Sequence, residues 1–126
     1  MKEGNVLLEK SYAFALRTVK LFLHLRKEHG SLSIFDQQLR AGTSIGANAE
    51  EAVGGQSRRD FISKCSISYK EARESHYWLR LYRDTKLLEP KLAESLLNDN
   101  EELKKILASI LKTSKNTEGG QLKIKN

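Results

Sequence analysis

Basic side chains recur at helical spacing in two segments of the chain, and their spacing suggests contacts with nucleic-acid phosphates. In the first segment these residues fall within about 100 degrees of one another around a helix of 3.6 residues per turn. The second set also contains a tyrosine, whose ring is able to stack on an unpaired base. A solvated outer face remains the other interpretation of both sets. The predicted nucleic-acid-binding residues are Lys10, Arg17, Lys20, Lys27, Arg59, Lys70, Arg73, Tyr77 and Arg80.

A second polar set lies between residues 40 and 78 and suggests a structural role. If its two faces meet, within a subunit or between subunits, the arginine and the asparagine are able to satisfy the carboxylates and fix one register. Two neighbouring carboxylates also occur in acid–base catalysis, but the sequence places no nucleophile or metal-ligand cluster beside them. The predicted network residues are Arg40, Ser44, Asn48, Glu51, Glu71, Glu74 and Trp78.

The remaining reactive side chains do not form a catalytic or metal-binding pattern. No two of His24, His29 and His76 stand at the three- or four-residue spacing that brings metal ligands together on a helix. Cys65 falls on an apolar face, where cysteine acts as a small hydrophobic residue. The segment AGTSIGAN, residues 41–48, lacks the Lys-Ser/Thr ending of a phosphate loop. We therefore expect no catalytic residue, metal or cofactor.

One enzymatic alternative rests on Arg17 and His24, which are separated by six residues. This spacing resembles the Arg/His motif of helical ribonucleases of the HEPN type. That family places its motif late in the bundle, whereas here it falls in the first helix. A ribonuclease of this kind would lose RNA cleavage on His24→Ala substitution without loss of assembly.

These residues must be positioned by helices. The 126 residues include one proline and eight glycines and are rich in Leu, Ala, Lys, Glu and Ser, a composition typical of helices. Periodicity and stop signals predict four helices, at about residues 5–29, 33–53, 57–85 and 89–112. Short links predict an antiparallel up-down-up-down four-helix bundle over residues 1–112. Residues 113–126 lose this periodicity and are predicted to form a flexible basic tail.

Apolar spacing predicts which helical faces point inward. The second helix has small residues on its inward face, including Gly42 and Gly46, which allow a neighbouring helix to approach closely. For the first helix, steps of four and three residues predict the inward stripe Leu8, Tyr12, Ala15, Val19 and Phe22, widened by Leu16, Leu23 and Leu25.

The overall charge and the chain's start bear on partners and location. A formal net charge of +6, concentrated in residues 1–30, 57–86 and the tail, attracts anionic partners. The single cysteine excludes an intrachain disulfide, and the first residues lack a signal-peptide pattern. No run approaches the roughly 20 apolar residues that a membrane span requires. We expect a cytoplasmic protein without a membrane partner.

The stretch from Gln38 to Leu81 resembles the bacterial family known as "four helix bundle protein". That family includes proteins encoded in intervening sequences of large-subunit ribosomal RNA genes and the accessory variability protein of diversity-generating retroelements. The resemblance extends over about residues 5–112, with departures at Ala49, Glu50 and Cys65. The matching positions are Arg40, Ala41, Ser44, Ile45, Ala47, Asn48 and Glu51, then Phe61, Lys70, Glu71, Ala72, Glu74, Tyr77, Trp78 and Leu79.

The resemblance implies a homopentameric barrel of four-helix subunits with a positively charged surface and no enzyme activity. In the retroelement branch, that assembly binds nucleic acid and a reverse transcriptase. The leading hypothesis is therefore a non-enzymatic, self-assembling protein that binds RNA or DNA. The alternative is an oligomeric scaffold for a protein partner such as a reverse transcriptase.

Overall fold

The chain folds into four α-helices in a computed structural model. The structure describes the backbone of residues 2–125 and the side chains of residues 4–114. They are α1 (Lys2–His29), α2 (Ser33–Val53), α3 (Arg58–Asp84) and α4 (Pro90–Lys125). No strand occurs within residues 2–125, so the predicted all-α class is confirmed. Most helix ends lie within one residue of the predicted positions, and the largest difference is at the end of α4.

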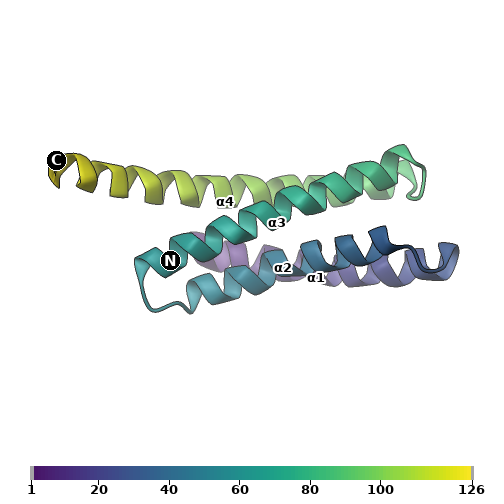
Figure 1. Cartoon of the computed structure of the whole chain (residues 1–126). Coiled ribbons are helices and arrows are strands. Elements are labelled where there is room, and N and C mark those ends of the chain that lie inside the picture. Colours follow the sequence, from purple (N-terminus) through teal and green to yellow (C-terminus); the bar gives the residue numbers. More distant parts are fainter. Residues whose placement is uncertain (1, 126) are drawn as a thin grey trace.

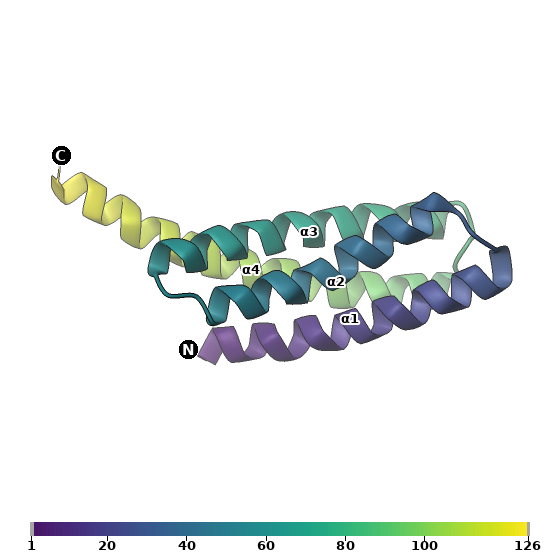
Figure 2. The ribbon, with the colours of Figure 1, turned by 60° about the horizontal axis from the view of Figure 1, so that its bottom comes forward.

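The helices run in alternating directions and pack side by side (Figure 1). The α2–α3 loop lies at the same end of the bundle as the N-terminus, and the other two loops lie at the opposite end (Figure 2). Helix α1 contacts α2 and α4, and α3 contacts the same two helices. Consequently α1 and α3 lie diagonally across the bundle from one another, a relationship that separates two surfaces described below.

Local signals explain where the helices begin and end. Gly30 follows α1 with a positive φ of 78°, a conformation that glycine adopts without strain, and its N–H donates to the Arg26 carbonyl at 2.8 Å. The Ser57 hydroxyl accepts a hydrogen bond from the Asp60 backbone N–H at 3.0 Å and caps α3. Pro90 begins α4, where its missing N–H would have no helical partner.

The inward face of α1 differs from the predicted one. Its buried apolar residues are Leu7, Phe14, Leu21 and Leu25, with Ser11 and Thr18 between them. Tyr12 and Val19, predicted to be buried, are exposed, and Leu8, Ala15 and Phe22 are half-buried. Leu16 and Leu23, predicted to widen the core stripe, are also exposed, whereas Leu25 is buried as predicted.

This error has a simple cause, because α1 carries two stripes with the same alternation of four and three residues, and polar Ser11 and Thr18 interrupt the one that faces the bundle. Periodicity shows that a stripe exists but not which of two stripes faces the bundle. The other helices each bury one apolar stripe, which includes Phe35 and Ile45 on α2, Ala72 on α3 and Leu103 on α4.

Buried polar side chains connect neighbouring helices. The Ser68 hydroxyl on α3 donates to the Ile45 carbonyl on α2 at 2.8 Å, and the Asn100 amide on α4 donates to the Ala72 carbonyl on α3 at 3.0 Å. Because both side chains are fully buried, these bonds replace hydration that the polar groups lose on folding. They fix the lengthwise register of α3 against its two neighbours.

Helix α4 is longer than predicted. The expected tail, residues 113–126, has a helical backbone as far as Lys125, and α4 extends beyond the other helices in both views (Figures 1 and 2). Side chains from residue 115 onward and the backbone of residue 126 lie outside the described residues, and flexibility of this segment stays a prediction. Among the described helices, none combines the length and apolar character needed to cross a membrane.

Candidate nucleic-acid interface

A basic hollow of about 590 Å³ lies along α3 and α4. Four of the predicted nucleic-acid-binding residues line it, because they recur along the side of α3 that adjoins α4. Residues at steps of three and four along a helix share one face, so their side chains border the same space. The lining residues are Lys70, Arg73, Glu74, His76, Tyr77, Arg80 and Lys104.

The cations that α3 contributes to the hollow are exposed. Lys70, Arg73 and Arg80 make no ion pair with any carboxylate of the part of the chain described here. The Arg80 guanidinium lies 5.9 Å from the centre of the Tyr77 ring, within the range of a cation–π contact. Tyr77 itself is 50% exposed, which leaves ring surface free for stacking. The hollow therefore combines unpaired positive charge with an accessible aromatic ring.

Two residues of the hollow were not predicted from the sequence. Lys104 comes from α4, where its Nζ lies 2.7 Å from Glu101 Oε1, and His76 Nε2 lies 3.3 Å from the same carboxylate oxygen. Burial, followed by the positive charge of Lys104, holds the pKa of His76 below its ordinary value. The up-down order of the helices predicts that α4 lies beside α3. Which α4 residue borders the hollow depends on the lengthwise register between the two helices, and this register places Lys104 there.

Glu74 is the acidic residue of the hollow, and its charge is compensated. It accepts a hydrogen bond from Trp78 Nε1 at 3.1 Å and forms an ion pair with Arg40 of α2. Arg40 also bonds Glu71 at 3.0 Å. Burial alone would raise the pKa of Glu74, but hydrogen bonds from Trp78 and Arg40 together lower it. The structure thus brings Arg40, Glu71, Glu74 and Trp78 together within one subunit.

The other residues of the predicted network are engaged elsewhere. The Ser44 hydroxyl donates to the Arg40 carbonyl at 2.6 Å, and the Asn48 amide donates to the Ser44 carbonyl at 2.8 Å, both within α2. Glu51 forms an ion pair with Lys64 of α3 at 3.1 Å. Among the described residues, the ion pairs between α2 and α3 therefore fall into two separate groups, one at Arg40 and one at Glu51.

The basic stripe of α1 is partly neutralised by α4. Lys10 forms an ion pair with Glu102, and Arg17 Nη1 lies 2.6 Å from Asp99 Oδ2. Lys20 lines a small hollow of about 220 Å³ between α1 and α4, together with Arg17 and His24.

The remaining predicted binding residues also lie apart from the α3 hollow. Lys27 is exposed near the end of α1, and Arg59 is exposed at the start of α3 without lining the hollow. Because α4 lies between α1 and α3, the two predicted basic faces remain separate on one subunit.

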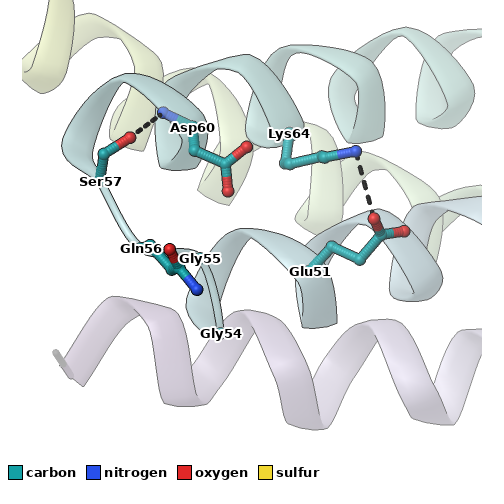
Figure 3. A pocket seen from close by; sticks show the side chains of 7 residues that line it. All are labelled: Glu51, Gly54, Gly55, Gln56, Ser57, Asp60 and Lys64. Atoms are coloured by element: carbon teal, nitrogen blue, oxygen red, sulfur yellow. Dashed lines mark hydrogen bonds and ion pairs between the residues drawn. The ribbon is translucent and has the colours of Figure 1, made fainter.

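A second hollow, also of about 590 Å³, lies at the α2–α3 loop (Figure 3). The Ser57 hydroxyl points toward the backbone N–H of Asp60, and Lys64 points toward Glu51, so these polar groups already have partners. The hollow follows from the loop around Gly54 and Gly55.

Metal and nucleophile chemistry have little support among these side chains. Within the described residues, His, Cys, Asp and Glu form no group of three or more placed to hold a metal ion. Cys65 is fully buried, and burial raises its thiol pKa to about 11. A buried thiol of high pKa is a poor nucleophile, since the thiolate is the reactive form.

Comparisons with known proteins agree with the helical architecture. Residues 3–109 match the family described as 23S rRNA-intervening sequence protein. A crystal structure of a protein of unknown function from the S23 ribosomal protein family of Bacteroides thetaiotaomicron is 45% identical, with a TM-score of 0.84, covering 87% of this chain and 98% of that one. No curated protein matches the chain. On the extent of the family match, the chain belongs to the 23S rRNA-intervening sequence protein family.

Proposed function

We propose that this protein is a non-enzymatic, self-assembling nucleic-acid-binding protein whose main phosphate contacts come from the α3–α4 hollow. The observation that carries the proposal is the convergence of Lys70, Arg73 and Arg80 on one hollow in which they have no carboxylate partner among the described residues. Lys104 adds a fourth cation from α4.

The chemistry of the hollow favours the sugar–phosphate backbone over individual bases. Each phosphate neutralised by Lys or Arg releases condensed counterions, a gain that does not depend on base sequence. Tyr77 adds a surface on which any unpaired base is able to stack. Binding through this hollow should therefore be salt-sensitive, weakly sequence-specific and stronger for single strands that have unstacked bases.

Self-assembly belongs to the proposal because it multiplies the hollow. One hollow holds few cations, whereas a symmetric oligomer presents several copies of it. Each further phosphate contact releases more counterions, so the contributions of the copies to binding add together. The family resemblance implies five subunits. A mass of about 72 kDa, five times 14.3 kDa, is the corresponding expectation.

A non-enzymatic role is supported by the state of the two residues in the ribonuclease alternative. Arg17 is held by Asp99 at 2.6 Å, so its guanidinium is less available to a scissile phosphate. His24 is exposed and lines the small hollow between α1 and α4 together with Arg17. It does not line the α3–α4 hollow that holds the unpaired cations. Incubation of the wild-type protein with labelled RNA should leave the RNA intact.

The test is a titration of labelled single-stranded RNA and duplex DNA at low and moderate salt. Lys70→Glu/Arg73→Glu should weaken binding by tenfold or more at low salt, since two cations become two anions in the hollow. The matched control is Lys86→Glu/Lys91→Glu, which makes the same change in net charge at exposed residues outside the hollow.

The outcomes separate the candidate functions. Loss of binding in the hollow variant alone, with unchanged oligomer mass, supports the proposal. Equal loss in both variants indicates attraction by net charge only and contradicts a defined site. No binding by the wild type leaves the scaffold for a protein partner, such as a reverse transcriptase, as the better hypothesis.

A further inference from the structure

The α3–α4 hollow contains one carboxylate among its cations, and one oxygen of that carboxylate is free. Glu74 accepts hydrogen bonds from Arg40 and from Trp78 Nε1, and both bonds use Oε2. Within the part of the chain described here, Glu74 Oε1 makes no hydrogen bond or ion pair. The Glu74 side chain is 36% exposed and lines the hollow, so it presents an unused acceptor to a ligand bound there.

Trp78 connects this carboxylate to the aromatic ring of the hollow. Its Nε1 donates to Glu74 Oε2 at 3.1 Å, and its ring packs edge-on against Tyr77 with the ring centres 5.0 Å apart. Tyr77 follows Glu74 by three residues on α3, so the two side chains share one helix face. Tyr77 remains half-exposed despite its contacts with Trp78 and Arg80. A base stacked on this ring therefore brings one of its edges toward the Glu74 carboxylate.

The negative charge of Glu74 works against the binding of phosphates in the same hollow. Although burial acts to raise the pKa of Glu74, its hydrogen bonds with Trp78 and Arg40 lower it below 4.5, so the group is a carboxylate at neutral pH. The contacts with Arg40 and Trp78 account for Oε2 alone. Oε1 is left to accept from a ligand group that donates hydrogen bonds, which a phosphate does not.

The four bases differ in the donors that they offer to a carboxylate. Guanine carries two adjacent donors, N1–H and the N2 amino group, on its Watson–Crick edge. Adenine and cytosine carry one amino group beside a ring-nitrogen acceptor, and uracil carries one N–H between two carbonyls. A carboxylate that approaches those three bases meets an acceptor beside the donor, whereas guanine presents donors only.

Guanine also suits the cations of the hollow. Its O6 and N7 atoms accept hydrogen bonds from Arg or Lys side chains. Arg73 directly precedes Glu74, and Lys70 lies four residues before it; both are exposed and line the hollow. Guanine therefore matches the carboxylate with its donors, the cations with its acceptors and the Tyr77 ring with its flat face.

We propose that Glu74 selects guanine at the nucleotide that stacks on Tyr77. This inference rests on the proposed nucleic-acid binding and adds a base preference at one position of the bound strand. Phosphate contacts still supply most of the affinity, so binding remains weakly sequence-specific overall. Because the contact is partly exposed, the preference for guanine over each other base should be about fivefold.

The experiment titrates short labelled oligouridines that carry a single central G, A, C or U, all at the same low salt. The wild type should bind the guanine-containing strand about fivefold more tightly than the other three. Glu74→Gln should bind all four alike. Because Arg40 and Trp78 donate to the Oε2 position, they hold the amide oxygen there, and the amide NH2 takes the place of Oε1. The free acceptor thus becomes a donor.

The same variant separates base selection from a purely structural role of Glu74. Loss of a negative charge from the hollow should strengthen binding to the A, C and U strands. Damage to the fold would instead weaken binding to all four strands and lower the helix content measured by circular dichroism.

Glu101→Gln is the matched control. Glu101 pairs with Lys104 and His76, which line the hollow, but does not line it itself. The variant makes the same change of charge beside the hollow and should keep the guanine preference.

The outcomes separate this inference from the proposed function. A guanine preference that persists in Glu74→Gln, or that disappears equally in both variants, overturns the role of Glu74. Equal binding of the four strands by the wild type overturns it as well, while phosphate binding stands. Failure of the wild type to bind any strand overturns the proposed function, and the guanine preference with it.

Discussion

Thr18 on α1 lies so close to Gly42 on α2 that a β-carbon at position 42 would be 2.5 Å from the Thr18 hydroxyl oxygen. It would also lie 2.6 Å from the Thr18 methyl carbon and 3.1 Å from the Gln38 amide nitrogen. Thr18 has little freedom to move, because it is buried and its hydroxyl donates to the Phe14 carbonyl at 2.8 Å. The close packing of α1 on α2 thus depends on the absence of a side chain at Gly42.

Gly42→Ala should therefore lower the free energy of unfolding, although alanine is the better helix former. Overpacking costs about 1–3 kcal/mol, and the gain in helix propensity offsets up to about 1 kcal/mol. We expect a net loss of about 1–2 kcal/mol. Urea denaturation followed by circular dichroism at one protein concentration would measure it.

Thr18→Ala/Gly42→Ala provides the control for this explanation. The alanine at position 18 removes the two closest atoms that the new β-carbon would meet and leaves only the Gln38 amide nitrogen, so the double variant should lose less stability than the sum of the single variants. Additive losses would show that contact with Thr18 is not the reason for glycine at this position.

Particular residues show how far the sequence predicts the fold. The starts of α3 and α4 lie within one residue of the predicted positions, because the Ser57 cap and the Pro90 ring act through local backbone geometry. The inward face of α1 was wrong, because two stripes share one period and the choice depends on contacts with other helices. Burial of Asn100 was missed for the same reason, since its amide depends on the Ala72 carbonyl of another helix.

The candidate site shows the same difference between features that one helix determines and features that depend on contacts between helices. Lys70, Arg73, Tyr77 and Arg80 were identified from the sequence because they belong to one helix face. Lys104 was missed, because its position depends on the register between two helices. The pairing of Arg17 with Asp99 was also missed, although it decides how much free charge α1 presents.

Glu74→Gln should destabilise the protein near neutral pH by about 1 kcal/mol or less, as expected for a partly exposed ion pair. The pKa of Glu74 is lowered in the folded state, so its contribution is present above the ordinary value of 4.5 and is lost as pH falls through the folded-state pKa. The difference between wild type and variant should therefore shrink in acid. Unfolding monitored by the fluorescence of Trp78, the single tryptophan, would follow it.

The matched control for this pH effect is Glu50→Gln. Glu50 is an exposed carboxylate on α2 that makes no ion pair with the described residues, so its replacement should change stability little at either pH. If both variants show the same pH profile, the Arg40–Glu74–Trp78 contact does not contribute to stability.

Cys65 should react slowly with a thiol reagent such as dithionitrobenzoate while the protein is folded. Burial raises its thiol pKa to about 11, so only about one molecule in a thousand carries a thiolate at pH 8. In urea the thiol is exposed and should react at the rate of a free cysteine. Rapid stoichiometric labelling of the native protein would contradict the buried position.

His76 is the group through which pH should change the basic hollow. Burial and the nearby charge of Lys104 lower its pKa below the ordinary value of 6.5, while Glu101 opposes this shift. Proton NMR titration should therefore give a value under 6.5. Lys104→Met should raise it in part, because burial remains, whereas Lys105→Met removes the same charge from the next residue and should change it less.

The same shift sets the sign of two pH effects. Between the folded-state pKa and 6.5, the unfolded chain binds more protons than the folded one, so the contribution of His76 to stability falls as pH drops through this range. Nucleic-acid binding should change in the opposite direction, because a protonated His76 adds a cation to the hollow. His76→Gln should weaken both dependences, and unchanged dependences in this variant would assign them to other groups.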